Sequence, residues 1–243
     1  MVYKINESLK IMVLQLLISF FAMTGLLAQS NVANKYGLFV VNDIKLLQQE
    51  IVADSNKKLI DLQNAIPALV IDLRYASVHN FMHRKLYPTL HTTYLRLPAA
   101  NALQKVEADL QSHQLTLKIF DAYRPYSVTE EMWEAVKDSR YAADPSRGSG
   151  HNRGIAVDLT LIDFHTKKEL RMGTGFDNFS DTAHQDFTEL PGDILENRRL
   201  LKTVMEKYGF ISLDTEWWHF SLPDINNFEL LNVSFGALKK MNH

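Results

Sequence analysis

Four stretches of the chain have apolar positions at strand spacing. Residues 155–161 alternate, as do residues 218–222, which places Asp158 opposite to Val157 and Leu159, and His219 opposite to Trp218 and Phe220. Apolar runs at residues 69–75 and 115–120 predict two further strands, the second of which ends at Asp121. Two acid or imidazole side chains, Asp158 and His219, are therefore expected on strands rather than on loose loops.

Helical spacing alternates with these strands along the chain. Pro98 opens a segment with Leu103, Val106 and Leu110 at helical intervals, and a second helix is expected from about Val128 to Asp138. Asp193 with Glu196 resembles a capping arrangement for a third helix, which carries Leu201, Val204, Met205 and Tyr208 and which Gly209 would end. This mixed order predicts an α+β fold, an antiparallel sheet flanked by helices.

The first 28 residues differ in pattern from the rest. Lys4 and Lys10 precede an apolar run from Ile11 to Leu27, and the small residue Ala28 follows before polar Gln29 and Ser30. This order is typical of a secretory signal peptide, so we expect residues 1–28 to be removed and residues 29–243 to form a single domain. A transmembrane helix is the alternative interpretation of the same apolar run. Export predicts a periplasmic location with no stable membrane association after cleavage.

Charge and cysteine content narrow the possible functions. The whole chain carries a formal charge of −2 and no cysteine. Such a surface gives no electrostatic case for nucleic acid, and an exported chain without cysteine has no disulfides to stabilise it. The core, together with a bound metal, is then expected to supply the stability.

A three-ligand metal site is the first candidate for chemistry. His151 precedes Asp158 by seven residues, and Gly154 between them lets the backbone turn, so both side chains can face the same way. If His219 lies on a neighbouring strand, two imidazoles and one carboxylate converge. That set suits zinc with a fourth position open for water.

A catalytic zinc site also needs a base and an oxyanion donor. Glu216 precedes His219 by three residues and is the candidate base, beside Trp217 and Trp218, which would exclude water. Arg124 follows a predicted strand and is the candidate donor to a developing oxyanion. Taken singly, each of these residues also fits an ordinary core or surface role.

Several stretches in order resemble one known family. DLRYA at 72–76, NF at 80–81, FDAYRP at 120–125, S-x-H-x-x-G-x-A-x-D at 149–158, MGT-x-FD at 172–177 and EWWH at 216–219 are similar to the D-alanyl-D-alanine dipeptidases. That family is related to the zinc D,D-carboxypeptidases and to the hedgehog-type fold. The resemblance runs from about Leu69 to Leu222.

The resemblance implies a role for each matching residue. It implies that His151, Asp158 and His219 bind one zinc ion per chain, that Glu216 is the general acid and base, and that Arg124 steadies the transition state. It also implies substrate contacts: Tyr75 and Asp177 with the free ammonium group, and Ser149 with the carboxylate. The implied reaction is hydrolysis of the small dipeptide D-Ala-D-Ala to two molecules of D-Ala.

Two departures from the family pattern stand out. His83 lies where this group often carries glycine, and we expect it not to bind the metal. The export signal is the second departure, and it favours recovery of D-Ala from cell-wall fragments. The polar segment Thr174 to Glu189 is a candidate cover for the pocket.

Two other functions stay open at this point. A zinc D,D-carboxypeptidase acting on peptidoglycan stem peptides would need no ammonium site, and a non-catalytic zinc-containing binding module would need no base. The sequence leaves the oligomeric state undetermined.

Overall fold

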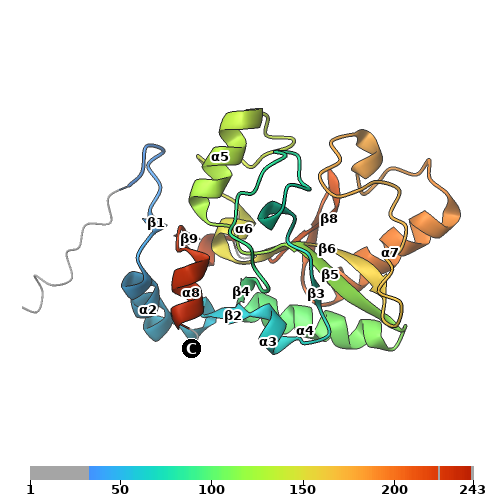
Figure 1. The fold of residues 1–243 in the computed structure, drawn as a ribbon, viewed down its shortest axis with the longest axis horizontal. Helices are drawn as coiled ribbons and strands as arrows, with labels where there is room; N and C mark the ends of the chain where they lie inside the picture. The colour runs from blue at the N-terminus through green and yellow to red at the C-terminus, as the bar shows by residue number, and fades with distance from the viewer. Residues whose placement is uncertain (1–32, 224, 242–243) are drawn as a thin grey trace, which may run out of the picture.

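A computed structural model describes residues 33–223 and 225–241 (Figure 1). The predicted signal peptide, residues 1–28, lies outside the described residues, so its cleavage stays a prediction. Among the helices described, none has both the length and the apolar character needed to span a membrane.

The central sheet carries the candidate site. In the described part of the chain its strand order is β3-β5-β6-β8-β7, with neighbours antiparallel except for the parallel pair β3 and β5. The strands are β3 (Val70–Ile71), β5 (Leu115–Asp121), β6 (Ala156–Asp163), β8 (Glu216–Ser221) and β7 (Ile211–Leu213). The α+β prediction is confirmed, and the one parallel edge strand is a correction to the purely antiparallel sheet.

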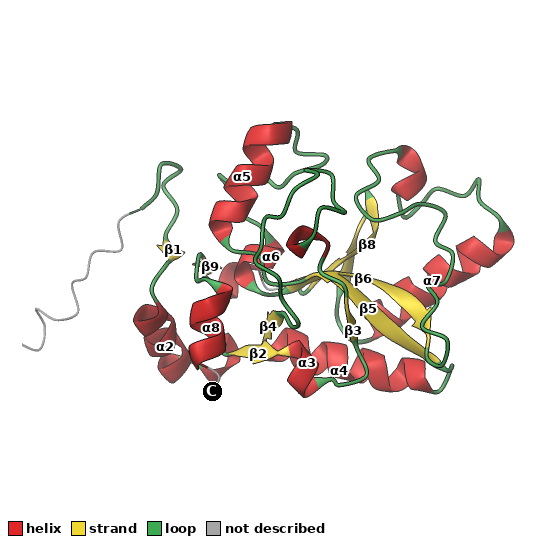
Figure 2. Cartoon of the chain, viewed as in Figure 1, coloured by secondary structure: helices red, strands yellow, loops and turns green. Residues whose placement is uncertain are grey.

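Helices and loops cover the two faces of this sheet (Figures 1 and 2). The helices are α2 (Ile44–Ala53), α3 (Leu62–Ala65), α4 (Leu97–Gln111), α5 (Tyr126–Val136), α6 (Gly150–Arg153), α7 (Gly192–Lys207) and α8 (Phe235–Met241). Short strand pairs are β1 (Val40–Val41) with β9 (Leu230–Leu231), and β2 (Leu59–Asp61) with β4 (Tyr94–Arg96). In the view of Figure 1, α4 runs below the sheet, α5 and long loops lie above it, and α6 lies at the left-hand end of β6.

The predicted helices form, with changes at their ends. In α4 the side chains Leu103, Val106 and Leu110 are fully buried in one core cluster with the apolar residues of β5 and β6. The helix α7 begins at Gly192 after Pro191, and no side-chain cap forms there. The capping prediction is wrong, because the helix starts before Asp193 and Pro191 holds the cap position; the Asp193 carboxylate accepts a hydrogen bond from Arg171 at 3.1 Å.

The predicted strand at residues 69–75 is much shorter in the structure. Only Val70 and Ile71 pair with β5, and the chain then forms a 3-10 turn at Arg74–Ala76. The turn places Leu73 and Tyr75 in two different core clusters, which a continuing strand at the sheet edge would not do. This early end of β3 carries Tyr75 over the sheet toward the candidate site.

Both faces of β6 are covered. Every residue from Ala156 to Ile162 is buried, including the polar Asp158 and Thr160. The loop after β6 contributes the cover, because the Phe176 ring packs on those of Phe120, at 5.1 Å, and Trp218, at 5.5 Å. Asp158 is therefore held in a low-dielectric site, where a lone carboxylate is costly unless it is paired.

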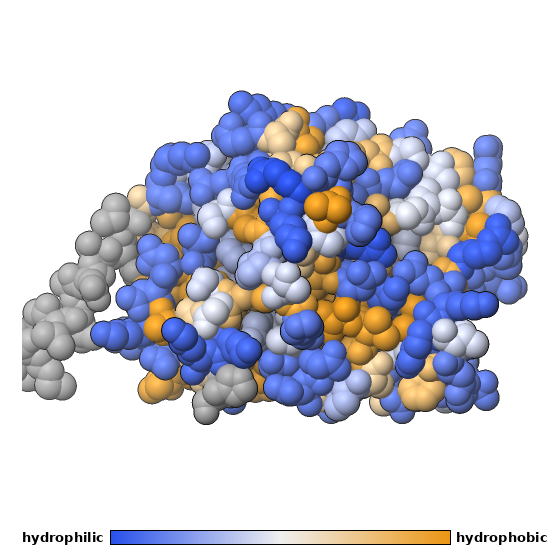
Figure 3. Space-filling view, in the orientation of Figure 1, coloured by the Kyte–Doolittle hydropathy of each residue, from blue (hydrophilic) through white to orange (hydrophobic). Residues whose placement is uncertain are grey.

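The surface in Figure 3 is mainly hydrophilic, with apolar atoms showing in separate areas. The exposed large apolar side chains come from five segments, and only Ile211 and Leu213 share one, β7: the set is Phe39, Val52, Val78, Phe164, Ile211 and Leu213. Isolated exposed apolar residues of this kind are normal on a folded protein.

Glu107 links α4 to the sheet and offers a test of the core. Its buried carboxylate accepts hydrogen bonds from the Thr116 hydroxyl at 2.6 Å and the Leu117 backbone N–H at 3.1 Å. We predict that Glu107→Ala lowers the free energy of unfolding by about 2 kcal/mol, because the buried Leu117 N–H loses its acceptor and Thr116 keeps only its bond to the Ala68 carbonyl oxygen. Glu107→Gln keeps an acceptor for the Leu117 N–H, so its free energy of unfolding should fall by less.

The pH dependence of stability should also distinguish Glu107→Gln from the wild type. Burial raises the pKa of Glu107, so the folded state holds this proton more tightly than the unfolded chain does. The contribution of Glu107 to stability is then complete below its ordinary pKa of about 4.5 and falls as the pH rises through the folded value. We expect urea unfolding at pH 5 and pH 8 to show a smaller deficit in the free energy of unfolding of Glu107→Gln, relative to the wild type, at the higher pH. A difference that does not change with pH would contradict this account.

Candidate active site

His151 is placed by the short helix α6. Ser149 caps this helix by accepting a hydrogen bond from the His151 backbone N–H at 3.2 Å, and Asn152 bonds back to the Ser149 N–H at 3.0 Å. Gly154 ends the helix with φ of +71°, a conformation that favours glycine. The turn predicted at Gly154 is confirmed, and it brings His151 to the same face as Asp158.

Asp158 and His219 are brought together by strand register. They are directly opposite partners in the antiparallel pair of β6 and β8. The Nδ1 atom of His219 lies 2.9 Å from Oδ1 of Asp158 and 3.2 Å from Nε2 of His151. The Nε2 atom of His151 lies 3.3 Å from the other Asp158 oxygen, Oδ2. The three side chains therefore converge, and one donor atom from each lies within 4.8 Å of the others.

The hydrogen bond from His151 to Ala122 fixes which ring nitrogen is free. Nδ1 of His151 lies 2.7 Å from the carbonyl oxygen of Ala122, and since a carbonyl only accepts, Nδ1 carries the proton. Nε2 is then the ring nitrogen left to bind a metal, and it points at Asp158 and His219. This arrangement, with the outer nitrogen bonded to a carbonyl, is the usual way that a protein orients a metal-binding histidine.

The donor set fits a zinc ion. Two imidazoles and a carboxylate are the protein ligands of many catalytic zinc sites, which leave a fourth position for water. His151 and Asp158 are buried, while His219 remains partly accessible from a cavity. Burial alone would raise the pKa of Asp158, but the two imidazoles hold it below its usual range, so the carboxylate is ionised and ready to bind a cation.

Glu216 lies beside the converged ligands. It begins β8, its Oε2 lies 3.9 Å from Nδ1 of His219, and it lines a cavity of about 440 Å³ with all three ligand residues. Burial raises the pKa of Glu216 to about 7, against the lowering effects of His219 and Arg124. A carboxyl group with a pKa near neutrality can both accept and return a proton.

Arg124 faces the same cavity from the end of β5. Its Nε and Nη2 atoms both donate to Oδ2 of Asp121, at 2.9 Å and 2.7 Å, and Nη2 lies 3.9 Å from Asp158. The guanidinium also lies 5.0 Å from the centre of the Tyr75 ring. These contacts hold a buried positive charge in one orientation next to the ligand cluster.

Tyr75 and Asp177 form a second polar centre in the cavity. The Tyr75 hydroxyl donates to Oδ1 of Asp177 at 3.0 Å, while Oδ2 of Asp177 is buried without a hydrogen-bond partner among the described residues. Burial raises the pKa of Asp177 to about 8. An unpaired buried acceptor of this kind suits a positively charged donor, which would also restore the ionised carboxylate.

Ser149 and Trp218 complete the cavity lining that the sequence predicted. Trp217 does not line this cavity: its indole N–H donates to the Thr174 hydroxyl at 2.8 Å, and the ring borders a different cavity. Of the two tryptophans, only Trp218 borders the candidate site.

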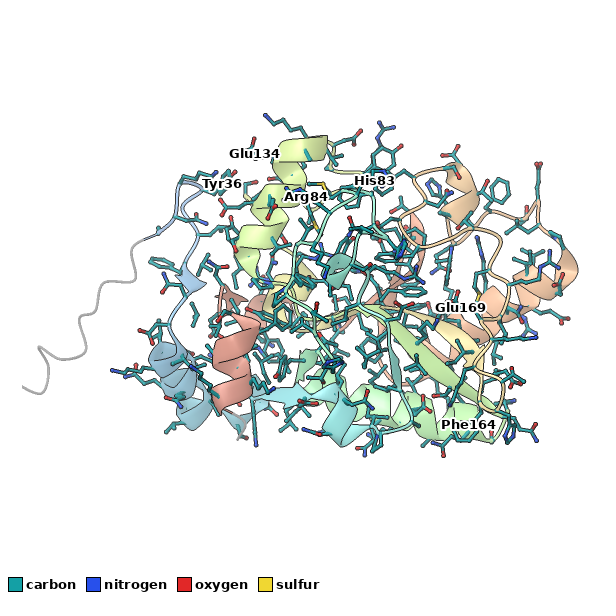
Figure 4. All side chains as sticks on the ribbon, viewed as in Figure 1. Tyr36, His83, Arg84, Glu134, Phe164 and Glu169 are labelled. Carbon is teal, nitrogen blue, oxygen red and sulfur yellow. The ribbon has the colours of Figure 1, made fainter. Side chains whose placement is uncertain are left out.

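His83 is separate from the ligand cluster. It is exposed on the outer loop near α5 (Figure 4), and its φ of +52° lies in the region that favours glycine. Glycine would adopt this backbone conformation at less cost than histidine does. The segment is also tied to α5 by an ion pair between Arg84 and Glu131.

The structure also shows residues near the site to which the sequence analysis gave no role. Asp121 is fully buried and holds Arg124, and Tyr87 donates to Asp121 at 3.0 Å. Phe81 and Tyr141 border the cavity and both pack on Phe179. The sequence does contain one feature that could have predicted the role of Asp121, because an acid at a strand end three residues before an arginine is a natural ion-pair partner. No comparable sequence feature marks Tyr87.

Comparisons with known proteins agree with this geometry. Residues 55–235 match the family model described as D-ala-D-ala dipeptidase. The D-alanyl-D-alanine dipeptidase of Escherichia coli (strain K12) is 38% identical over 180 residues, covering 74% of this chain and 92% of the relative. The dipeptidase of the same name from Streptomyces coelicolor is 30% identical over 172 residues, covering 63% of this chain and 85% of the relative.

A solved structure gives a weaker likeness. A vancomycin-resistance D,D-dipeptidase in complex with a D-Ala-D-Ala phosphinate analog superposes with a TM-score of 0.33 at 19% identity, over 76% of this chain and 71% of that one. The chain belongs to the D-alanyl-D-alanine dipeptidase family.

Proposed function

We propose that this chain is a zinc dipeptidase that hydrolyses D-Ala-D-Ala to two molecules of D-Ala. The observation that carries the proposal is the convergence of His151, Asp158 and His219 at one end of a cavity that also holds Glu216, Arg124 and the pair of Tyr75 and Asp177. The relatives from Escherichia coli and Streptomyces coelicolor are named for this activity.

The three ligand residues would hold the zinc ion. Zinc bound there would lower the pKa of a water molecule and polarise the scissile carbonyl. Glu216 is placed to accept the proton of the attacking water and to pass it to the amide nitrogen, which leaves as the amine of the second D-Ala. The water oxygen forms the new carboxylate as the peptide bond breaks, so one water is consumed per dipeptide.

Arg124 supplies the fixed positive charge of the reaction. Its side chain is held by Asp121, so little reorganisation is needed when negative charge develops on the carbonyl oxygen. Preorganised donors of this type contribute about 3 to 4 kcal/mol of transition-state stabilisation. Arg124 therefore acts on the transition state more than on substrate binding.

Recognition of the free amino end explains why a dipeptide is the substrate. The unpaired Oδ2 of Asp177, with the Tyr75 hydroxyl beside it, is the acceptor for the substrate ammonium group. Ser149 lines the same cavity at the start of α6, and by the family resemblance we propose it as the contact for the substrate carboxylate. An acylated amino group has no positive charge and would leave Asp177 unpaired, so longer D,D-peptides should be poor substrates.

Export remains part of the proposal. The pattern of residues 1–28, with two lysines before an apolar run that ends at Ala28, supports a cleaved signal and a periplasmic enzyme that recovers D-Ala from cell-wall fragments. Fractionation of cells that express the full chain, with N-terminal sequencing of the product, should give a periplasmic protein that begins at about Gln29. A cytoplasmic protein that keeps residues 1–28 would contradict export but would leave the proposed reaction unaffected.

The general base can be tested separately from the metal. We predict that Glu216→Ala lowers kcat by about a thousandfold while the protein still binds one zinc ion, because Glu216 moves the proton and is not itself a ligand. Metal analysis and turnover of D-Ala-D-Ala on the same sample check both halves. Glu206→Ala, which removes an exposed carboxylate on α7, is the matched control and should keep full activity. Loss of zinc together with activity in Glu216→Ala would show that Glu216 is a ligand instead.

The ammonium site separates a dipeptidase from a carboxypeptidase. We predict that Asp177→Asn lowers kcat/KM for D-Ala-D-Ala by about a hundredfold, because one charged hydrogen bond is lost. Its activity on N-acetyl-D-Ala-D-Ala, low in the wild type, should not fall further. The measurement is hydrolysis of both compounds by both proteins. Rapid wild-type cleavage of N-blocked tripeptides would replace the proposal by a D,D-carboxypeptidase acting on stem peptides.

A further inference from the structure

Tyr87 is buried beside the 3-10 turn at Arg74–Ala76, where its ring packs on Tyr75, and it does not itself line the cavity. Its hydroxyl donates a hydrogen bond to Oδ1 of Asp121 at 3.0 Å. The proposed reaction gives this hydrogen bond no role. Asp121, however, also holds Arg124, which the reaction uses.

The carboxylate of Asp121 divides its two oxygens between two partners. Oδ2 accepts both hydrogen bonds from Arg124, and Oδ1 accepts the one from Tyr87. Asp121 is fully buried, so no solvent competes for either oxygen. The Tyr87 hydroxyl therefore fixes the rotation of the Asp121 carboxylate, and that rotation fixes the plane of the Arg124 guanidinium.

The backbone of the same residue holds the ammonium site. The N–H groups of Leu86 and Tyr87 both donate to the carbonyl oxygen of Tyr75, at 2.8 Å and 3.0 Å. The Tyr75 ring in turn lies below the Arg124 guanidinium, and its hydroxyl reaches Asp177. Tyr87 is thus bonded on one side to the residue that would hold the substrate amino end and on the other to the partner of Arg124.

We propose that Tyr87 is a positioning residue: through Asp121 it sets the guanidinium of Arg124 against the scissile carbonyl, at a fixed distance from the ammonium site formed by Tyr75 and Asp177. The inference rests on the proposed dipeptidase function. In a dipeptide the amino group and the scissile carbonyl are separated by one residue, so a small shift of Arg124 relative to Tyr75 would misplace the donor for the developing oxyanion.

The substitution Tyr87→Phe isolates the hydroxyl. The ring packs on Tyr75 at 6.0 Å and on Phe235 at 5.0 Å between centres, and phenylalanine keeps these contacts and both backbone bonds to Tyr75. Only the hydrogen bond to Asp121 is lost. A purely structural role of the ring would then leave turnover unchanged.

Tyr123→Phe is the matched control. The Tyr123 hydroxyl is equally buried and also makes hydrogen bonds, to the carbonyl oxygen and N–H of Val233 at 2.7 Å and 3.0 Å, away from the cavity. Its loss should lower thermal stability without changing kcat. Any general effect of removing a buried hydroxyl is therefore visible in this variant.

The experiment is a double-mutant cycle on hydrolysis of D-Ala-D-Ala by the zinc-loaded enzyme. We expect Tyr87→Phe to lower kcat about tenfold with KM within about twofold of the wild type, as is typical when a residue that orients a functional group is lost. In the Arg124→Ala background the same substitution should change kcat by less than about twofold, because the residue it orients is gone.

Two results would overturn the inference while leaving the proposed function intact: Tyr87→Phe with wild-type kcat, or a tenfold loss that is repeated in full in the Arg124→Ala background. A wild-type enzyme that is inactive on the dipeptide would overturn the proposed function and this inference together.

Discussion

The pairing of Asp158 with His219 across β6 and β8 is the constraint on which the rest of the site depends. The two residues are directly opposite in register, which brings a buried carboxylate within 2.9 Å of an imidazole nitrogen. A shift of either strand by one residue would turn one of these side chains to the other face of the sheet. His151 then needs only the turn at Gly154 to reach the same point.

The charges around this pair explain what the cavity can bind. Asp121, Asp158, Asp177 and Glu216 lie around Arg124, and burial raises the pKa values of Asp177 and Glu216 to about 8 and 7. Such a concentration of acids in a poorly solvated site is costly unless cations enter. A zinc ion at the three ligands and an ammonium group at Asp177 would bring the charges of the site close to balance. The same electrostatics therefore favour both the metal and a substrate with a free amino end.

Most strands and helices could be predicted from the sequence because they depend on local patterns, whereas the convergence of the site residues depends on the pairing of β6 with β8 and was implied by the family resemblance. Alternation around Asp158 and His219 gave their strands, and the glycine at 154 gave the turn after His151. The early end of β3 was missed, because it depends on which core cluster Tyr75 joins. The cap at Asp193 was wrong because the helix begins at Gly192, and a helix end can differ by one or two residues from its sequence pattern. Tyr87 was missed because its partner Asp121 is 34 residues away along the chain.

The most direct test of the account is to locate the metal. A crystal of the purified, zinc-loaded protein measured at the zinc absorption edge should show one strong anomalous peak, about 2.0 to 2.1 Å from Nε2 of His151 and from Nδ1 of His219 and within bonding distance of Asp158. No peak at these residues, or zinc bound elsewhere while the enzyme hydrolyses D-Ala-D-Ala, would contradict it.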